Sequence, residues 1–297
     1  MNRSLRSVVT VIVSIFIACF GSWLFLRSNA ASKPLKPPFA HGFNKIHGDG
    51  YPALFFQFQR PQSKESSATL GDLSDLAGRA RGTVGAGLWL DVRLNGSSDL
   101  VVSSSDLLSN GKPIEIASLE ECRADGIVTL VEAAPFLKDT YVVLNLIARR
   151  PGLPTKLFEV WGDGKPLSFD WTLVQSESDG ILKELREQAP KAFYGSSQAT
   201  MLQLEILSTL GLEGLPDLKS DALISMIEEP SRNDSVPAPR LRDSTLKEAH
   251  RRNLKRYVGP VRTREVAVPL LVAGYDGIVL TERGIWEDLL DERHLLQ

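Results

Sequence analysis

The candidate chemistry of this sequence centres on one carboxylate, Asp91, which ends the apolar run Leu88-Trp89-Leu90. A carboxylate at the carboxyl end of a buried parallel strand is where (β/α) barrels hold catalytic residues and metal ligands. Asp91 is therefore a candidate ligand for Mg²⁺ or Ca²⁺, which prefer several oxygen donors. Trp89, two residues earlier on the same strand face, supplies no oxygen, and packing in a buried strand is its expected role. The missing second carboxylate favours a structural role for Asp91, as an acceptor from a loop N–H or in an ion pair with Arg149.

The histidines and cysteines do not predict a metal cluster. The 297 residues contain four histidines and two cysteines, all scattered along the chain, so neither a thiolate site nor a disulfide framework is expected. His41 lies at the end of a short apolar run and before a glycine, where it is a candidate site residue. A polar residue without a chemical role is the alternative, and His47 is the substitute if the first strand is displaced.

Eight short apolar runs alternate with helix-like segments, a pattern typical of a parallel α/β architecture. Eight strands, each followed by a helix, are what a closed (β/α)8 TIM barrel requires. We therefore predict such a barrel over residues 39–297, with the candidate site residues at its strand ends. The predicted strands are Phe39–His41, Leu88–Val92, Leu100–Ser103, Tyr141–Ile147, Thr172–Gln175, Ala192–Gly195, Lys255–Gly259 and Asp276–Leu280.

Four sequences with a hydroxyl residue three positions before an acid predict helix starts. They are Ser118–Glu121, Thr129–Glu132, Ser176–Asp179 and Thr245–Glu248. In such a capping box the hydroxyl accepts from a free backbone N–H of the first turn, and the acid accepts from the N–H of the capping residue. The basic residues after the last start are interpreted as solvated surface. A net charge of -2 gives no general attraction to nucleic acid, and no nucleic-acid partner is expected.

The N-terminal segment predicts a membrane anchor. Residues Val8 to Leu26 carry no charge, and a helix of this length, at about 1.5 Å per residue, nearly spans a bilayer core of about 30 Å. The run is longer than the usual apolar stretch of a cleaved signal peptide, so residues 1–30 are expected to stay as an anchor, with cleavage as the alternative. Residues 31–38 are rich in Lys, Pro and Ser and predict a tether. The barrel is expected outside the cytoplasm, periplasmic or, after cleavage, secreted.

The order of these motifs resembles that of the glycerophosphodiester phosphodiesterase family, whose fold is a (β/α)8 barrel. The resemblance extends from about Phe39 to Glu287. Phe39–Gly42 is similar to the first-strand histidine segment of the family, and Gly85–Leu94 and Leu100–Asp106 are similar to its second and third strands. Val143–Arg149, Leu173–Ser176 and Ala273–Arg283 are similar to the fourth, fifth and final strands.

The resemblance implies a divalent metal, Mg²⁺ or Ca²⁺, held by three carboxylates, and two histidines that transfer protons. His41 matches the first histidine, and Asp91 matches one metal ligand. Arg149 keeps the charge of the basic residue expected after the fourth strand. The candidate site residues are therefore His41 and Arg149 as catalytic residues and Asp91 as the metal ligand.

Four positions of the implied site depart from the family pattern. Trp89 and Ile147 occupy the places of the second and third carboxylates, and the second histidine falls on Ser104 or Ser105. The arginine expected beside the first histidine is also missing. A serine cannot serve as general acid near neutral pH because its hydroxyl holds the proton too tightly.

We therefore expect a membrane-tethered phosphodiesterase-like protein with an incomplete metal and general-acid site. It would be weakly active or inactive and bind a phosphodiester or polyol ligand. One alternative is an active phosphoric diester hydrolase with a rearranged site, in which His41 is the base, Asp91 a ligand and Arg149 a phosphate contact. The other is a non-catalytic scaffold of the cell envelope, with the proline-rich loop Glu228–Asp243 contacting a partner protein.

Overall fold

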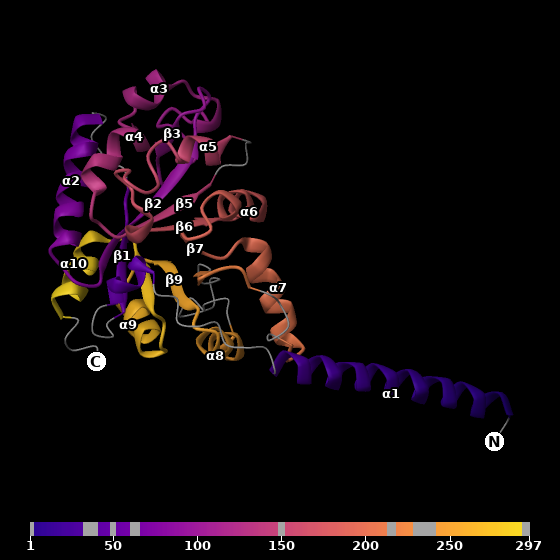
Figure 1. The fold of residues 1–297 in the computed structure, drawn as a ribbon. Helices are drawn as coiled ribbons and strands as arrows, with labels where there is room; N and C mark the ends of the chain where they lie inside the picture. The colour runs from indigo at the N-terminus through magenta and orange to yellow at the C-terminus, as the bar shows by residue number, and fades with distance from the viewer. Residues whose placement is uncertain are drawn as a thin grey trace.

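The computed structural model describes residues 3–31, 41–47, 52–59, 66–147, 152–212, 218–227 and 242–292 (Figure 1). Within these residues, eight parallel strands follow one another in the order β7-β6-β5-β2-β1-β10-β9-β8. The two end strands are joined by a backbone hydrogen bond of 2.8 Å from Asp221 N to Tyr194 O. The result is a nearly closed barrel surrounded by helices, and the predicted TIM-barrel architecture is confirmed. The strands are β1 (Ala53–Gln57), β2 (Ala86–Leu94), β5 (Val142–Leu146), β6 (Thr172–Ser176), β7 (Phe193–Tyr194), β8 (Ala222–Met226), β9 (Lys255–Val261) and β10 (Gly277–Leu280).

The predicted first strand was wrong. Phe39 and Ala40 lie outside the described residues, and His41 directly precedes the 3₁₀-helix η1 (Gly42–His47). The first barrel strand is β1, which the sequence analysis missed together with β8. Phe43 and Ile46 of η1 are fully buried, because their three-residue spacing puts both side chains on one face of a 3₁₀-helix. That face packs into the amino-terminal end of the barrel.

The predicted strand at Leu100–Ser103 exists but is not a barrel strand. It forms β3 (Leu100–Val102), which pairs antiparallel with β2 and with β4 (Val128–Thr129). The connection from β2 is a tight turn in which Asp99 N donates to Asn95 Oδ1 at 2.8 Å. A parallel crossover needs a dozen or more residues, so this turn can only produce a hairpin.

The helices and their caps agree in part with the predicted starts. Both capping boxes, Ser118 with Glu121 and Thr129 with Glu132, are formed. The predicted start at Ser176 was wrong, because Ser178 caps the helix Asp179–Gln188. The predicted start at Thr245 lies two residues after the first residue of the helix Asp243–Arg251. The helices beyond the barrel's first strand are α2 (Ser66–Arg81), η2 (Ile114–Ile116), α3 (Leu119–Ala124), α4 (Leu130–Ala133), η3 (Ala134–Leu137), α5 (Leu153–Leu157), η4 (Phe169–Trp171), α6 (Asp179–Gln188), α7 (Gln198–Thr209), α8 (Asp243–Arg251), α9 (Arg264–Val272) and α10 (Arg283–Glu292).

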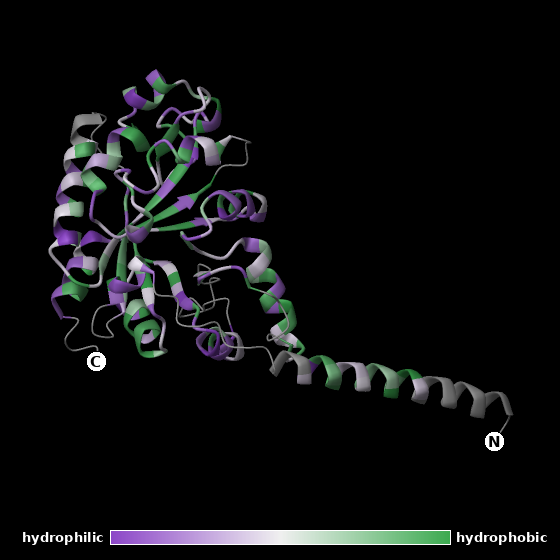
Figure 2. Ribbon diagram, viewed as in Figure 1, coloured by the Kyte–Doolittle hydropathy of each residue, from purple (hydrophilic) through white to green (hydrophobic). Residues whose placement is uncertain are grey.

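The barrel strands contribute apolar residues to both of their faces, and Figure 2 shows green segments in these strands beside purple ones. Alternate residues of a strand point to opposite faces. Accordingly Leu54, Leu88 and Leu144 pack outward under the helices, whereas Phe55 and Trp89 fill the barrel interior together with residues of η1. The interior is therefore a packed core, and room for a ligand is confined to the carboxyl ends of the strands.

Helix α1 (Arg3–Ala31) runs away from the barrel (Figure 1). Among the residues described, no helix was found that is long and apolar enough to cross a membrane. Side chains of α1 are described for residues 14–28 only. The predicted membrane segment Val8–Leu26 therefore begins outside them. Most of the predicted tether (residues 31–38) and of the loop Glu228–Asp243 also lies outside the described residues.

Candidate functional site

Asp91 lies inside the barrel near its carboxyl end and accepts three side-chain hydrogen bonds. Its Oδ1 accepts from Trp89 Nε1 at 2.9 Å and from Asn145 Nδ2 at 2.7 Å. Its Oδ2 accepts from Gln57 Nε2 at 2.8 Å. The side chain is 4% exposed. An ionised carboxylate can only accept hydrogen bonds, so these three N–H groups satisfy both oxygens of the buried charge without a cation.

Strand register brings these groups together. β2 lies between β1 and β5, with Gln57 opposite Trp89 and Asp91 opposite Asn145. Asn145 is in turn opposite Gln175 on β6. Side chains of opposed residues on neighbouring strands point to the same face. Asp91, Asn145 and Gln175 therefore form one polar row across three strands.

Two buried oxygen atoms in this row have no hydrogen-bond partner in the described part of the chain. They are Asn145 Oδ1 and Gln175 Oε1, and their side chains are 8% and 7% exposed. The Asn145 amide cannot be reversed, because its Nδ2 faces the acceptor-only carboxylate of Asp91. A buried unpaired acceptor costs about 1–3 kcal/mol, so a donor group of a ligand or a water molecule is the expected partner.

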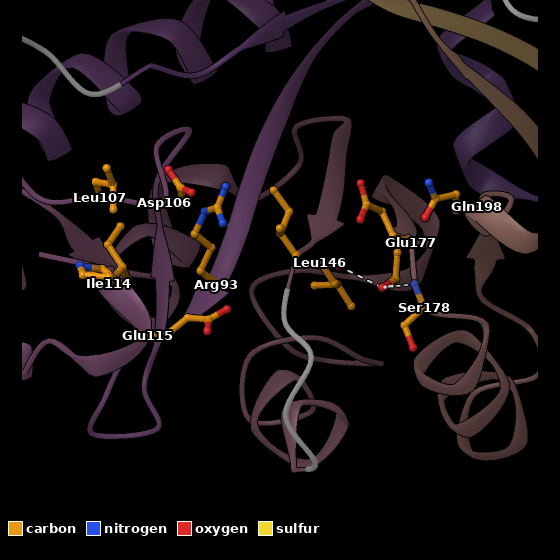
Figure 3. A pocket seen from close by; sticks show the side chains of 12 residues that line it. Arg93, Asp106, Leu107, Ile114, Glu115, Leu146, Glu177, Ser178 and Gln198 are labelled. Atoms are coloured by element: carbon orange, nitrogen blue, oxygen red, sulfur yellow. Dashed lines mark hydrogen bonds between the residues drawn. The ribbon is translucent and has the colours of Figure 1, made fainter. Parts of the chain in front are cut away.

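A cleft of about 690 Å³ lies at the carboxyl ends of β2, β5 and β6, and no member of the row lines it. Three residues that line it each come two positions after a member of the row. Arg93 lies on β2, and Ile147 and Glu177 directly follow β5 and β6. Figure 3 shows Arg93 and Asp106 on one wall of the cleft and Glu177 with Gln198 on the other. Arg93 Nε donates to Ser103 O at 3.3 Å.

The structure does not bring His41 to this end of the barrel. The His41 ring lies 5.2 Å from the ring of Phe193, the first residue of β7, and its Nδ1 accepts from Phe43 N at 3.0 Å. Burial lowers the pKa of His41 below its ordinary 6.5, against the opposing effect of the Asp170 charge. His41 is thus at the amino-terminal end, opposite Asp91.

The other predicted residues are also displaced from the expected arrangement. His47 is at the amino-terminal end too, with its Nε2 3.0 Å from Tyr257 Oη. Arg149 lies outside the described residues, so its predicted role and its pairing with Asp91 stay predictions. Ser105, at the position of the second histidine, makes only local bonds to the backbone of Leu107.

Sequence reasoning missed the three amides of the site, Gln57, Asn145 and Gln175. Gln57 is the last residue of β1, a strand that the sequence analysis did not predict. Neutral amides give no charge pattern, and their convergence depends on the register between strands. The usable signal was the two-residue spacing of Ala53, Phe55 and Gln57, which marks one strand face.

The residues at this site do not fit the divalent metal that the resemblance implies. Within the described residues, no group of three or more His, Cys, Asp or Glu side chains could hold an ion. Both oxygens of Asp91 face N–H groups, and one of these is the indole of Trp89, which has no lone pair to offer a metal. Mg²⁺ and Ca²⁺ need several oxygen ligands. The row supplies one carboxylate, Asp91, and two neutral amide oxygens, of Asn145 and Gln175, which is not the set of three carboxylates that the resemblance implies.

Fold and site define a (β/α)8 barrel with a hydrogen-bonded polar row, rather than a carboxylate cluster, at its carboxyl end. No family model matches the sequence, and no curated protein is significantly similar to it. Solved structures do match. A phosphodiesterase of Oleispira antarctica in complex with the product sn-glycerol-3-phosphate is 17% identical, with a TM-score of 0.54 over 82% of this chain and 97% of that one.

Two further solved structures give the same result. The glycerophosphodiester phosphodiesterase of Thermotoga maritima is 17% identical, with a TM-score of 0.53 over 80% of this chain and 98% of that one. The enzyme of Parabacteroides distasonis is 14% identical, with a TM-score of 0.54 over 82% of this chain and its own full length. The chain therefore has the fold of glycerophosphodiester phosphodiesterases.

Proposed function

We propose that this protein is a glycerophosphodiester phosphodiesterase-like barrel that binds a small phosphodiester or polyol without the metal-dependent hydrolysis of the family it resembles. One observation supports this most directly: the three N–H groups of Gln57, Trp89 and Asn145 occupy the carboxylate of Asp91. These bonds use three of the roughly four lone-pair sites of the carboxylate, and only one site, on Oδ2, is left for an ion.

The proton-transfer groups point to the same conclusion. A general base has to lie within about 2.6–3.2 Å of the proton it removes, or within reach through one water. His41 and His47 are at the amino-terminal end of the barrel, and Ser105 is held in a local turn. The alternative of an active hydrolase with His41 as base and Asp91 as ligand has no support in this geometry.

The cleft offers complementary groups for a ligand with a phosphate and hydroxyls. Arg93 has terminal N–H groups beyond its bond to Ser103, and guanidinium pairs with phosphate oxygens in a bidentate manner. The carboxylates of Asp106 and Glu177 can accept hydrogen bonds from hydroxyl groups. The product complex of the Oleispira antarctica protein, which contains sn-glycerol-3-phosphate, supports this class of ligand.

Membrane attachment and an extracytoplasmic barrel are also part of the proposal. Large apolar side chains of α1 are exposed, among them Phe16 at 69% and Phe25 at 66%. Exposed apolar surface of this extent is typical of a segment that contacts lipid or another protein. Labelling of an added barrel cysteine, Ile116→Cys in a Cys19→Ser background, by a membrane-impermeant reagent on intact cells tests the location. Protection of that cysteine until the cells are lysed would contradict it.

Calorimetry of the full-length protein in detergent tests the ligand. We expect sn-glycerol-3-phosphate or a glycerophosphodiester to bind equally with and without Mg²⁺, Ca²⁺ or EDTA, and no product to form. Arg93→Gln should weaken binding at least tenfold, because a charge-assisted bond to an ionised group contributes about 1.5–3 kcal/mol. Arg123→Gln, an exposed arginine outside the cleft, is the matched control. Metal-dependent turnover would overturn the proposal.

A further inference from the structure

Helix α7 exposes a row of large apolar side chains on its outer face. Leu202, Ile206 and Leu210, at its carboxyl end, are 55%, 55% and 53% exposed. Residues four apart in a helix lie on the same side, so these three form one apolar stripe. The opposite side of α7 buries Leu204 in a cluster that includes Ala249 of α8. The fold therefore uses only one face of this helix and leaves a hydrophobic one outside.

Helix α1 exposes large apolar side chains in its middle part. Ile15, Phe16 and Ile17 are consecutive and are 58%, 69% and 64% exposed. Successive residues of a helix point about 100° apart, so three in a row cover most of its circumference. A helix that is apolar all round belongs inside a hydrophobic environment, and a lipid bilayer provides one for a helix that stands apart from its own protein.

Helix α1 contacts the backbone of Leu210, the residue that directly follows α7. Trp23 Nε1 of α1 donates to Leu210 O at 3.0 Å, and the guanidinium of Arg27 lies 5.1 Å from the centre of the Trp23 ring. Tryptophan and arginine next to an apolar helix are typical of the level at which a bilayer meets water. This junction therefore places Leu210 at the expected membrane surface.

The directions of the two helices extend this argument along α7. In Figure 1, α1 leaves the barrel beside the carboxyl end of α7 and runs steeply across the direction of the α7 axis. A bilayer crossed by α1 would consequently lie along α7 rather than end-on to it. Of the exposed positions of α7, Glu205 alone carries a charge, so little opposes contact with lipid.

We propose that α7 is an interfacial helix, whose stripe of Leu202, Ile206 and Leu210 lies on the surface of the lipid bilayer into which α1 inserts. The side of the barrel that carries α7 would then contact the membrane, and the barrel would have a fixed orientation relative to the bilayer. This inference rests on the membrane attachment proposed above and is independent of the ligand in the cleft. The competing explanation is that a second copy of the chain covers the apolar stripe.

Spin labelling in lipid nanodiscs tests the contact in the full-length chain. Cys122 is fully buried and Cys19 is exposed, so a Cys19→Ser background accepts single labels at Leu202→Cys, Ile206→Cys and Leu210→Cys. We expect all three labels to gain accessibility to oxygen and lose accessibility to a water-soluble nickel complex. Ile116→Cys, on η2 and 60% exposed, is the control that should stay accessible to nickel.

The native Cys19 separates the two parts of the argument. A label there, in the otherwise unchanged chain, reports whether α1 is in the bilayer. Lipid-protected Cys19 with nickel-accessible labels on α7 would overturn the α7 contact while leaving membrane attachment intact. Nickel-accessible Cys19 would overturn both. Dipolar broadening between labels at Ile206→Cys in discs that hold two chains would show a second copy on the stripe and would also overturn the proposal.

Discussion

Trp89 donates its indole N–H to the carboxylate of Asp91, its neighbour two residues along the same strand face, at 2.9 Å. A residue that the sequence shows only as a missing ligand thus has a defined role. Its ring lies in the barrel interior, and its nitrogen donates to the buried carboxylate of Asp91. At residue 89, where the resemblance implies a metal ligand, the structure has a hydrogen-bond donor to Asp91.

Asp91→Asn should destabilise the protein. The substitution removes the charge and replaces one acceptor oxygen by an NH₂ group, which faces at least one of the three donors of Gln57, Trp89 and Asn145. Leaving a buried donor unpaired costs about 1–3 kcal/mol, and urea denaturation measures the loss. Asp106→Asn, an exposed acid of the cleft wall, should change stability by less than about 0.5 kcal/mol. Equal effects of the two substitutions would contradict the cage around Asp91.

The contact between Trp89 and Asp91 should appear as an energetic coupling. Trp89→Phe keeps an aromatic ring but removes the N–H, so in the Asp91→Asn background it should cost less than in the wild type. Groups in direct contact are typically coupled by about 0.5–3 kcal/mol in a double-mutant cycle. Trp286→Phe, which removes an indole bond to Leu54 O, is the matched control and should be additive with Asp91→Asn.

Divalent metals should leave the stability of the protein unchanged. An ion that binds the folded state at 100 times its Kd adds about 2.7 kcal/mol to the free energy of unfolding. Without a sufficient donor set around Asp91, neither Ca²⁺, Mg²⁺ nor EDTA should shift Tm in a calorimetric scan. A reproducible rise of Tm with Ca²⁺ that disappears in Asp91→Asn would show that the amides rearrange to admit an ion.

The pH dependence of stability should contain a contribution from His41. Its pKa is lowered in the folded state by burial, so below the ordinary value of 6.5 the unfolded chain binds more protons and stability falls. Stability should therefore decrease as the pH is lowered from 7 through the region below 6.5. His41→Asn, whose Oδ1 can accept from Phe43 N as Nδ1 does, should reduce this slope. His250→Asn, at an exposed position on α8, should leave it unchanged, and an unaltered slope in both variants would refute the assignment.

The sequence predicted the barrel architecture correctly but did not locate its first strand. Local signals were sufficient for the two capping boxes at Ser118 and Thr129 and for β2, β5, β6, β7, β9 and β10. The predicted first strand, Phe39–His41, is described only at His41, which is not part of a strand. It precedes a 3₁₀-helix instead, and the count of eight was restored only because β3 had also been included. Whether a strand belongs to the barrel depends on the length of its connection, as the tight turn after β2 shows.

The site was predicted at Asp91 and missed around it. A lone carboxylate at a strand end is visible in a sequence, but its partners Gln57 and Asn145 come from strands 34 and 54 residues away. Only the register of three parallel strands brings those amides to one carboxylate. The sequence alone shows that carboxylates are missing near Asp91. It does not show which N–H groups lie there instead, because that depends on the strand register.

The buried 3₁₀-helix η1 has a practical consequence for anyone who wishes to shorten this chain. Its Phe43 stacks on Phe55 and Phe193 inside the barrel. Residues that precede the first strand in the sequence therefore close the amino-terminal end of the barrel. A version trimmed to begin at Ala53 would keep every barrel strand but would expose the amino-terminal end of the barrel interior to water. Soluble versions of the protein should therefore begin ahead of His41.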